Sequence, residues 1–189
     1  TLGLLCIHEH LVSSLVKRQQ LADALKKNPA IEAQTIVAPI SIIGLPRTGT
    51  TILHELISSN ERFRHLATWE ADSPFPHPEE ASYKTDPRIE ATRKRYAFLR
   101  YISQGIDAIH EMDADLPQEC ILLQELSFRS RSFLSYHVPS YMRWIESCDM
   151  TSSYQWHKKA LQYLQYKFKR ERWILKNPHQ FWSMDKFLQ

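Results

Sequence analysis

The sequence predicts an α/β fold in which helices flank a parallel β-sheet. Two observations point to this fold class. A short apolar run at 36–43, rich in β-branched residues, leads into a glycine-bearing loop and then into a segment with helical period, 52–57. A second short apolar run, 172–175, follows a helical pattern near the end of the sequence. Strands that are separated by helices in this way favour parallel pairing within one sheet.

The composition is that of an ordinary globular domain. The chain has 189 residues, of which 43% are hydrophobic, enough for the core of one domain spanning residues 1–189. Its 24 basic and 21 acidic residues nearly balance, so we expect no binding of nucleic acid through bulk charge. No apolar run approaches the roughly 18 residues of a membrane-spanning helix, so we expect no stable membrane insertion. Three widely spaced cysteines form no CxxC pair, which favours reduced thiols and a cytoplasmic location.

The remaining elements follow from the periodicity. Apolar residues at helical spacing over 4–27 predict one or two amphipathic helices that end near Asn28-Pro29. The uninterrupted run 40–43 predicts a strand that is buried on both faces, with Pro39 at its start. Four prolines make 71–88 a loop. Helical patterns continue over three further ranges, which are 89–109, 118–128 and 154–168.

The loop after the first strand carries the chemistry. A strand that enters a tight glycine loop and then a helix points backbone N–H groups at one place, which favours a bound phosphate or similar anion. Gly44 and Gly49 have the spacing of a Walker A loop, G-x-x-x-x-G-K-S/T, so the sheet is expected to be P-loop-like. Thr50 replaces the Walker lysine, Thr51 keeps the hydroxyl, and the cation is Arg47. The alternative is an ordinary turn in which the arginine pairs with a nearby carboxylate.

Several segments in order along the chain resemble one enzyme family. The stretch Pro46-Arg47-Thr48-Gly49-Thr50-Thr51 resembles the 5′-phosphosulfate-binding loop of sulfotransferases that use 3′-phosphoadenylyl sulfate (PAPS). The other matching segments are Arg64, Trp69-Glu70, 115–119, 139–144 and 173–179. Together they resemble a bacterial-type sulfotransferase family, which is distantly similar to the tyrosylprotein sulfotransferases.

The resemblance implies transfer of a sulfuryl group from PAPS to a hydroxyl or amine, with adenosine 3′,5′-bisphosphate (PAP) as the product and no metal. It assigns Arg47 to the leaving phosphate and the sulfonate, Lys176 to the sulfonate, and the residues that follow Arg47 to the anion cradle. These cradle residues are Thr48, Gly49, Thr50 and Thr51. Independently, the carboxyl ends of parallel strands share one crevice, so Arg47 and Lys176 are expected to converge on one anion.

The resemblance also suggests a general base. A glutamate that follows the loop helix deprotonates the acceptor in the tyrosylprotein branch, and Glu70 matches it at a somewhat longer spacing. The alternative for Glu70 is a surface residue at the start of the proline-rich loop. His110 is a second candidate base, because the small-molecule cytosolic sulfotransferases use a histidine at roughly such a distance.

The resemblance leaves several questions open. The family holds the 3′-phosphate with an arginine and a serine on a later strand and helix, so we expect the chain to be truncated at its C-terminus before them. The acceptor could be a small molecule, a lipid or a carbohydrate, and the oligomeric state is unknown. Two other functions remain as alternatives. The loop also suits a nucleotide kinase, and the aromatic-rich segment 128–156 suits a non-catalytic helical interaction module.

Overall fold

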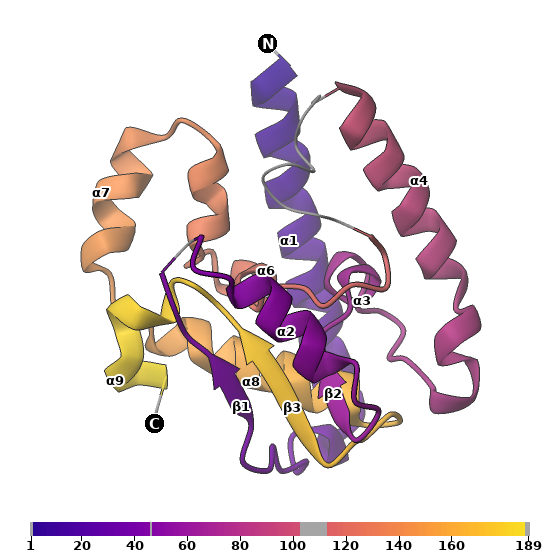
Figure 1. Cartoon of the computed structure of the whole chain (residues 1–189). Coiled ribbons are helices and arrows are strands. Elements are labelled where there is room, and N and C mark those ends of the chain that lie inside the picture. The colour runs from indigo at the N-terminus through magenta and orange to yellow at the C-terminus, as the bar shows by residue number, and fades with distance from the viewer. Residues whose placement is uncertain (1, 46, 103–112, 188–189) are drawn as a thin grey trace.

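The computed structural model describes residues 2–45, 47–102 and 113–187. Its sheet has three parallel strands in the order β1-β3-β2 (Figure 1). Their bounds are β1 Ile40–Ile42, β2 Phe63–His65 and β3 Arg172–Lys176. Because β3 lies between the other two, all its residues after Arg172 are buried. The predicted α/β class is therefore confirmed.

The register of the sheet brings two strand ends together. Ile42, the last residue of β1, is the partner of Lys176, the last residue of β3. On the other side, Phe63 of β2 pairs with Arg172 at the start of β3. The loop that follows β1 therefore begins beside the carboxyl end of β3, as a parallel sheet requires.

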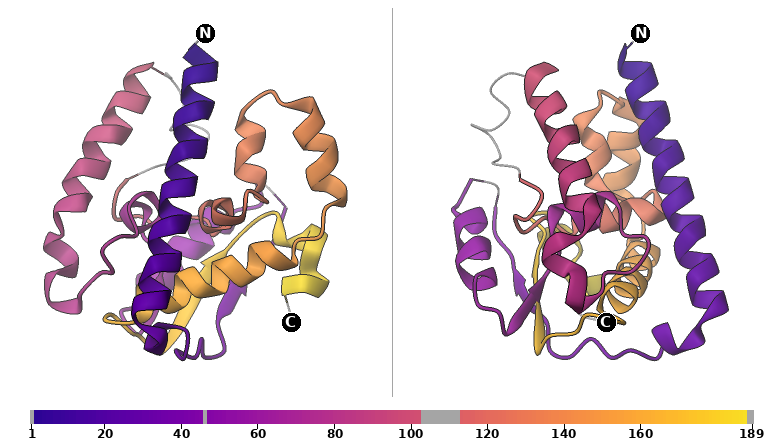
Figure 2. Two further views of the ribbon diagram at one scale, coloured as in Figure 1. Left: turned by 180° about the vertical axis from the view of Figure 1, so that it is seen from behind. Right: turned by 90° about the vertical axis from the view of Figure 1, so that its right-hand side faces the viewer.

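Helices cover both faces of the sheet. Helix α2 (Thr50–Ser58) contacts β3 and β2 on one face. Helix α8 (Thr151–Gln165) crosses the opposite face, and it lies in front of the strands in the rear view of Figure 2. Its Leu161 and Leu164 share a core with Trp173 and Leu175 of β3. The strand and α8 are also joined through the indole of Trp173, which donates a 2.9 Å hydrogen bond to Gln165 Oε1.

The predicted N-terminal helical segment is one helix, α1 (Leu2–Lys27). Only its C-terminal part belongs to the core, where Leu21 and Leu25 pack against α8 and the sheet. The N-terminal part extends away from the sheet (Figure 2) and leaves its apolar side chains exposed. These exposed residues are Leu4, Leu5, Leu11, Val12, Leu15 and Val16.

Five further α-helices belong to the described ranges. They are α3 Thr68–Asp72, α4 Pro87–Ile102, α6 Ile121–Gln124, α7 Pro139–Ser147 and α9 Met184–Phe187. The predicted loop 71–88 is largely irregular, with one 3-10 segment at Glu80–Thr85. In the described ranges no helix is both long enough and apolar enough to cross a membrane.

Two strand expectations need correction. The run at 40–43 was expected to be buried on both faces, but only Ile42 is fully buried in β1, because β3 is its one described partner in the sheet. Strand β2 was not predicted, because its three residues include Arg64 and His65 and lack an apolar run.

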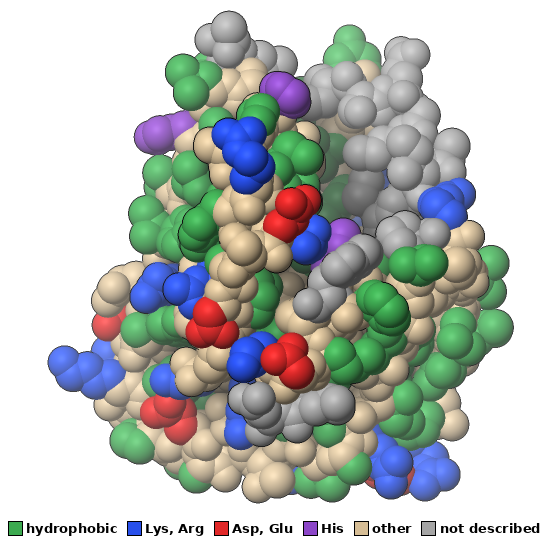
Figure 3. All heavy atoms as spheres, turned by 90° about the vertical axis from the view of Figure 1, so that its left-hand side faces the viewer, with side chains coloured by type: hydrophobic (Ala, Val, Ile, Leu, Met, Phe, Trp, Pro, Cys, Tyr) green, Lys and Arg blue, Asp and Glu red, His purple; other side chains and the backbone are tan. Residues whose placement is uncertain are grey.

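Charged groups on the face that Figure 3 shows are mixed. Basic and acidic side chains are interspersed with hydrophobic ones, and the described residues there form no continuous basic surface.

Candidate active site

The loop between β1 and α2 is tight, and its conformation requires glycine at two positions. Gly49 has φ of 83°, in the left-handed region where a side chain is strained. A Cβ at Gly44 would lie 2.8 Å from the Cγ2 atom of Thr50, closer than side chains tolerate. Arg47 also has positive φ, 67°, which is uncommon for a residue with a side chain and is often found at functional sites.

The loop leads straight into α2. Thr48 closes the turn by donating its hydroxyl to the carbonyl oxygen of Leu45 at 2.7 Å. Gly49 is the N-cap of α2 and supplies no side-chain acceptor to the first helical N–H groups. Donors at the start of a helix have no partners within the helix, so they are available to an anion that enters the loop.

Lys176 brings a buried cation to this loop. Lys176 is the last residue of β3 and is 4% exposed. Its Nζ donates to Thr51 Oγ1 at 3.0 Å and lies 2.7 Å from Glu119 Oε1. The structure therefore joins Lys176 to the first turn of α2, directly after the loop, through Thr51.

Arg47 lies in the same loop, three residues before α2, and its side chain is exposed. The backbone thus brings Arg47, in the loop after β1, and Lys176, at the end of the neighbouring β3, to the carboxyl edge of the sheet. Their shared role at one anion stays a prediction.

Glu119 is a residue for which sequence reasoning assigned no role. It lies on the segment that precedes α6, and its side chain is 21% exposed. Cys120, the next residue, donates its backbone N–H to the carbonyl oxygen of Lys176 at 2.8 Å, which ties this segment to the end of β3. In the sequence, a functional role for Glu119 is indicated only by its place in the segment 115–119, which resembles the family.

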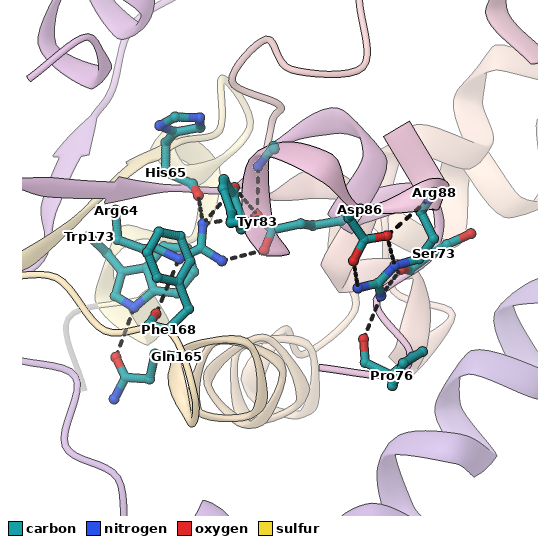
Figure 4. A network of polar contacts seen from close by, with 12 residues as sticks. Arg64, His65, Ser73, Pro76, Tyr83, Asp86, Arg88, Gln165, Phe168 and Trp173 are labelled. Atoms are coloured by element: carbon teal, nitrogen blue, oxygen red, sulfur yellow. Dashed lines mark hydrogen bonds and ion pairs between the residues drawn. The ribbon is translucent and has the colours of Figure 1, made fainter. Parts of the chain in front are cut away.

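Glu70 lies in a different environment. It is fully buried on α3, and its carboxylate forms a double ion pair with the guanidinium of Arg64 on β2 (Figure 4). The same carboxylate accepts hydrogen bonds from the backbone N–H of Ala67 and from the hydroxyl of Tyr83, both at 3.0 Å. Glu70 thus has the contacts of a structural ion pair. Its assignment as the base stays a prediction, and it would require this pair to open.

Other sequence candidates lie elsewhere. The second candidate base, His110, falls within 103–112, outside the described residues, as does Pro46 of the loop motif. The aromatic-rich segment 128–156 includes α7, on which Tyr141 packs against Trp144 at a centroid distance of 5.4 Å. Within the described ranges no three His, Cys, Asp or Glu side chains are placed to hold a metal ion.

The interior beside the loop carries histidines that stay uncharged. Burial lowers the pKa of His54 on α2 to about 4, with smaller contributions from His65 and from the charge of Lys176. Burial and the charge of Arg64 likewise lower the pKa of His65 to about 4. Near pH 7 these two histidines therefore add no positive charge to that of Lys176 and Arg47 at the loop.

Comparison with known proteins agrees with this geometry. Residues 39–189 match the sequence model of the sulfotransferase family. The sulfotransferase STF1 of Mycobacterium tuberculosis H37Rv superposes with a TM-score of 0.84 at 31% identity, over 99% of this chain and 52% of its own. The sulfotransferase STF9 of Mycobacterium avium superposes with a TM-score of 0.88 at 26% identity, over 100% of this chain and 49% of its own.

The chain thus spans about half the length of these two solved structures. No curated protein matches it significantly. The family match covers the loop, the strand that carries Lys176 and the helices between them. The chain belongs to the sulfotransferase family.

Proposed function

We propose that the protein transfers a sulfuryl group from PAPS to the hydroxyl or amine of a small molecule, a lipid or a carbohydrate, and releases PAP. The observation that carries this proposal is the buried ammonium of Lys176, which is hydrogen-bonded to Thr51 of a glycine loop. The loop has the backbone of an anion site, and its cation comes from β3 instead of from a Walker lysine. This arrangement favours a sulfonate donor over a nucleoside triphosphate.

The residues present fit such a donor. The left-handed turn at Gly49 directs the loop into α2, and the absence of a side chain at Gly44 lets Thr48 and Thr50 pack closely against it, which gives the tight loop that an anion site needs. PAPS supplies a sulfonate that is activated by its bond to a 5′-phosphate. Thr48, Thr50 and Thr51 would bind that phosphate through backbone N–H groups and hydroxyls.

The two cations would act on the developing charge. As the bond from sulfur to the phosphate oxygen breaks, negative charge grows on the phosphate, and preorganised cations stabilise it most in a site that excludes water. Lys176 is held in place by Thr51 and Glu119, so little reorganisation is needed. Arg47 would add a planar fork of donors that can bridge phosphate and sulfonate oxygens.

A cytoplasmic location is part of the proposal. All three cysteines are free thiols, and Cys6 is exposed. An exposed free thiol is typical of a reducing compartment. PAPS turnover in a cytoplasmic extract, absent from the secreted fraction of the same culture, is the result expected for this location.

Titration calorimetry of the full-length protein tests the donor class. We expect PAP to bind without a metal and more tightly than Mg-ATP. A preference for Mg-ATP would instead indicate a nucleotide kinase, and binding of neither ligand would favour an interaction module.

Two lysine variants test whether Lys176 is the cation that stabilises the sulfonate. Replacing Lys176→Ala should lower turnover of PAPS about 10²–10³-fold, the usual cost of one stabilising donor. The matched control is Lys167→Ala, because Lys167 also forms a pair with a glutamate, Glu79, but on the surface away from the loop. Turnover of this control should equal that of the wild type.

A further inference from the structure

We propose that Glu119 is the catalytic base that takes the proton from the sulfuryl acceptor. This inference rests on the proposed sulfotransferase function and names the residue that would complete it. Glu119 Oε1 lies 2.7 Å from Nζ of Lys176, and that ammonium also reaches Thr51 Oγ1 at 3.0 Å. Glu119 is therefore separated from the anion loop by a single side chain.

Access from solvent distinguishes Glu119 from Glu70. The side chain of Glu119 is 21% exposed, whereas the Lys176 side chain that it contacts is 5% exposed. The pair therefore runs from the interior toward the surface, with the carboxylate on the outer side. Glu70 and its partner Arg64 are 0% and 2% exposed, so that carboxylate has no open side. Of the two carboxylates, that of Glu119 is therefore the one that solvent reaches.

The two carboxylates also differ in how many hydrogen bonds they accept. Glu70 accepts from four groups, two on the guanidinium of Arg64 and one each on Ala67 and Tyr83. At Glu119, the hydrogen bonds and ion pairs of the described residues give the carboxylate one partner, Lys176, which lies at Oε1. An ionised carboxylate has about four acceptor positions, so Glu119 keeps capacity for the proton of an acceptor.

Backbone hydrogen bonds fix the position of Glu119. The N–H of Gln118 donates to Leu66 just beyond β2 at 2.7 Å, and the N–H of Cys120 donates to Lys176 at 2.8 Å. Between them, Glu119 donates its own N–H to Gln118 Oε1 at 2.8 Å. The segment is thus attached to two strand ends, and a base held this way needs little movement to act.

Four described ionisable groups interact electrostatically with Glu119. They are Lys176 at the end of β3, His54 on α2, His179 just beyond β3 and the adjacent thiol of Cys120. Burial lowers the pKa of both histidines, so they are neutral near pH 7. The charge that Glu119 meets is therefore the ammonium of Lys176, which would also contact the sulfonate.

The step is a balanced substitution at sulfur. The acceptor oxygen or nitrogen forms a bond to sulfur while the bond from sulfur to the 5′-phosphate oxygen breaks, and its electron pair stays on that phosphate. The acceptor proton moves to Glu119, which later releases it to water. Lys176 then neutralises part of the new phosphate charge. No oxidant, reductant or metal takes part in this exchange.

The test compares carboxylate variants of the full-length protein. The variants are Glu119→Gln, Glu119→Asp and Glu70→Gln. The matched control is Glu79→Gln, which alters a surface lysine–glutamate pair. Turnover of radiolabelled PAPS is measured with water and with a pooled set of alcohols, phenols and amines, together with the Kd for PAP and the pH profile of kcat. Thermal melts give the folded fraction of each variant.

We expect Glu119→Gln to lower kcat about 10²–10⁴-fold, the usual contribution of a general base, while the Kd for PAP changes less than about threefold. The acidic limb of the kcat profile should disappear in this variant. Glu119→Asp should retain part of the activity because it keeps a carboxylate. Glu79→Gln should match the wild type. A Glu70→Gln variant that loses kcat per folded molecule while Glu119→Gln keeps it would assign the base to Glu70 and overturn the proposal.

Other results would overturn the proposal. If Glu119→Gln keeps wild-type turnover, the base is another residue. If it weakens PAP binding and lowers kcat together while the acidic limb persists, Glu119 positions Lys176 and is not the base. If the wild-type protein neither binds PAP nor consumes PAPS, the proposed function itself fails, a result that is visible before any variant is made.

Discussion

At the scale of single residues, Arg64 and Glu70 form the most enclosed ion pair among the described residues (Figure 4). Three aromatic rings surround the guanidinium, those of Tyr83, Phe168 and Trp173, with its carbon atom 4.6–5.0 Å from their centroids. Burial and the charge of Glu70 raise the pKa of Tyr83, so its hydroxyl stays protonated and donates to the carboxylate. Every charge in this cluster has a partner, which buried ions require.

This pairing predicts how Glu70→Gln behaves. The change leaves the buried Arg64 without its counter-charge, and breaking a buried pair in this way costs about 3–5 kcal/mol of unfolding free energy. Urea unfolding measures the loss. The control is Glu171→Gln, at the exposed pair with Arg62, which should leave the unfolding free energy nearly unchanged. Wild-type stability of Glu70→Gln combined with lost turnover would instead support Glu70 as the base.

A second prediction at this scale concerns the loop backbone. Gly49→Ala places a Cβ on a residue with φ of 83°, which costs about 1–2 kcal/mol unless the loop changes shape. Because the loop N–H groups are aimed by this turn, we expect PAP to bind more weakly. Calorimetry with PAP measures the effect. Gly3→Ala, at an open helical position, should leave the Kd unchanged, and equal Kd values for both variants would contradict the assigned role of the loop.

At the scale of elements, α1 has two parts with different energetic roles. Leu21 and Leu25 belong to the main core, whereas Leu15 is 53% exposed. The helical period of the sequence is continuous through both parts, so periodicity alone does not tell which side chains are covered. Burial on folding decides the stabilisation that each leucine contributes.

Alanine variants of Leu21 and Leu15 test whether the two parts of α1 contribute differently to stability. Leu21→Ala removes a fully buried side chain and should lower the unfolding free energy by about 2–5 kcal/mol. Leu15→Ala should change it by less than about 0.5 kcal/mol, since surface substitutions have small effects. Chemical denaturation of both variants measures the difference. Equal losses would show that the exposed half of α1 is covered in solution.

How far the sequence predicts these elements depends on how local their signals are. Strand β3 and helix α2 have continuous apolar patterns, and both were predicted near their observed bounds. Strand β2 has three residues with a charged one in the middle, and only pairing with β3 makes it a strand. The same limit holds at the site. The anion loop is a local motif, whereas the contact between Glu119 and Lys176 depends on a chain segment that returns to β3.

At the scale of the whole molecule, three largely buried histidines link stability to pH. Burial is the first cause that lowers the pKa of His54, His65 and His157, each to about 4. Because the unfolded values lie near 6.5, the unfolded chain binds protons first as the pH falls. The stabilisation is complete above about pH 6.5 and is lost progressively toward pH 4.

This linkage predicts that the unfolding free energy falls steeply as the pH is lowered. Each histidine should remove about 1.4 kcal/mol of unfolding free energy per pH unit within that window. Urea unfolding at several pH values gives the slope. His157→Phe should reduce the slope by about one proton, whereas the exposed His8→Gln should leave it unchanged. An unaltered slope for the His157 variant would contradict the assignment.

The measurement that tests the central claim most directly is a double-mutant cycle on Arg47 and Lys176. Turnover of PAPS, as kcat/KM, is compared for Arg47→Ala, Lys176→Ala and the double variant. If both cations bind one sulfonate, each single change should cost about 10²–10³-fold, and the double variant should lose much less than the product of the two. Losses that multiply, or single variants with wild-type kcat/KM, would show that the two side chains do not share one anion.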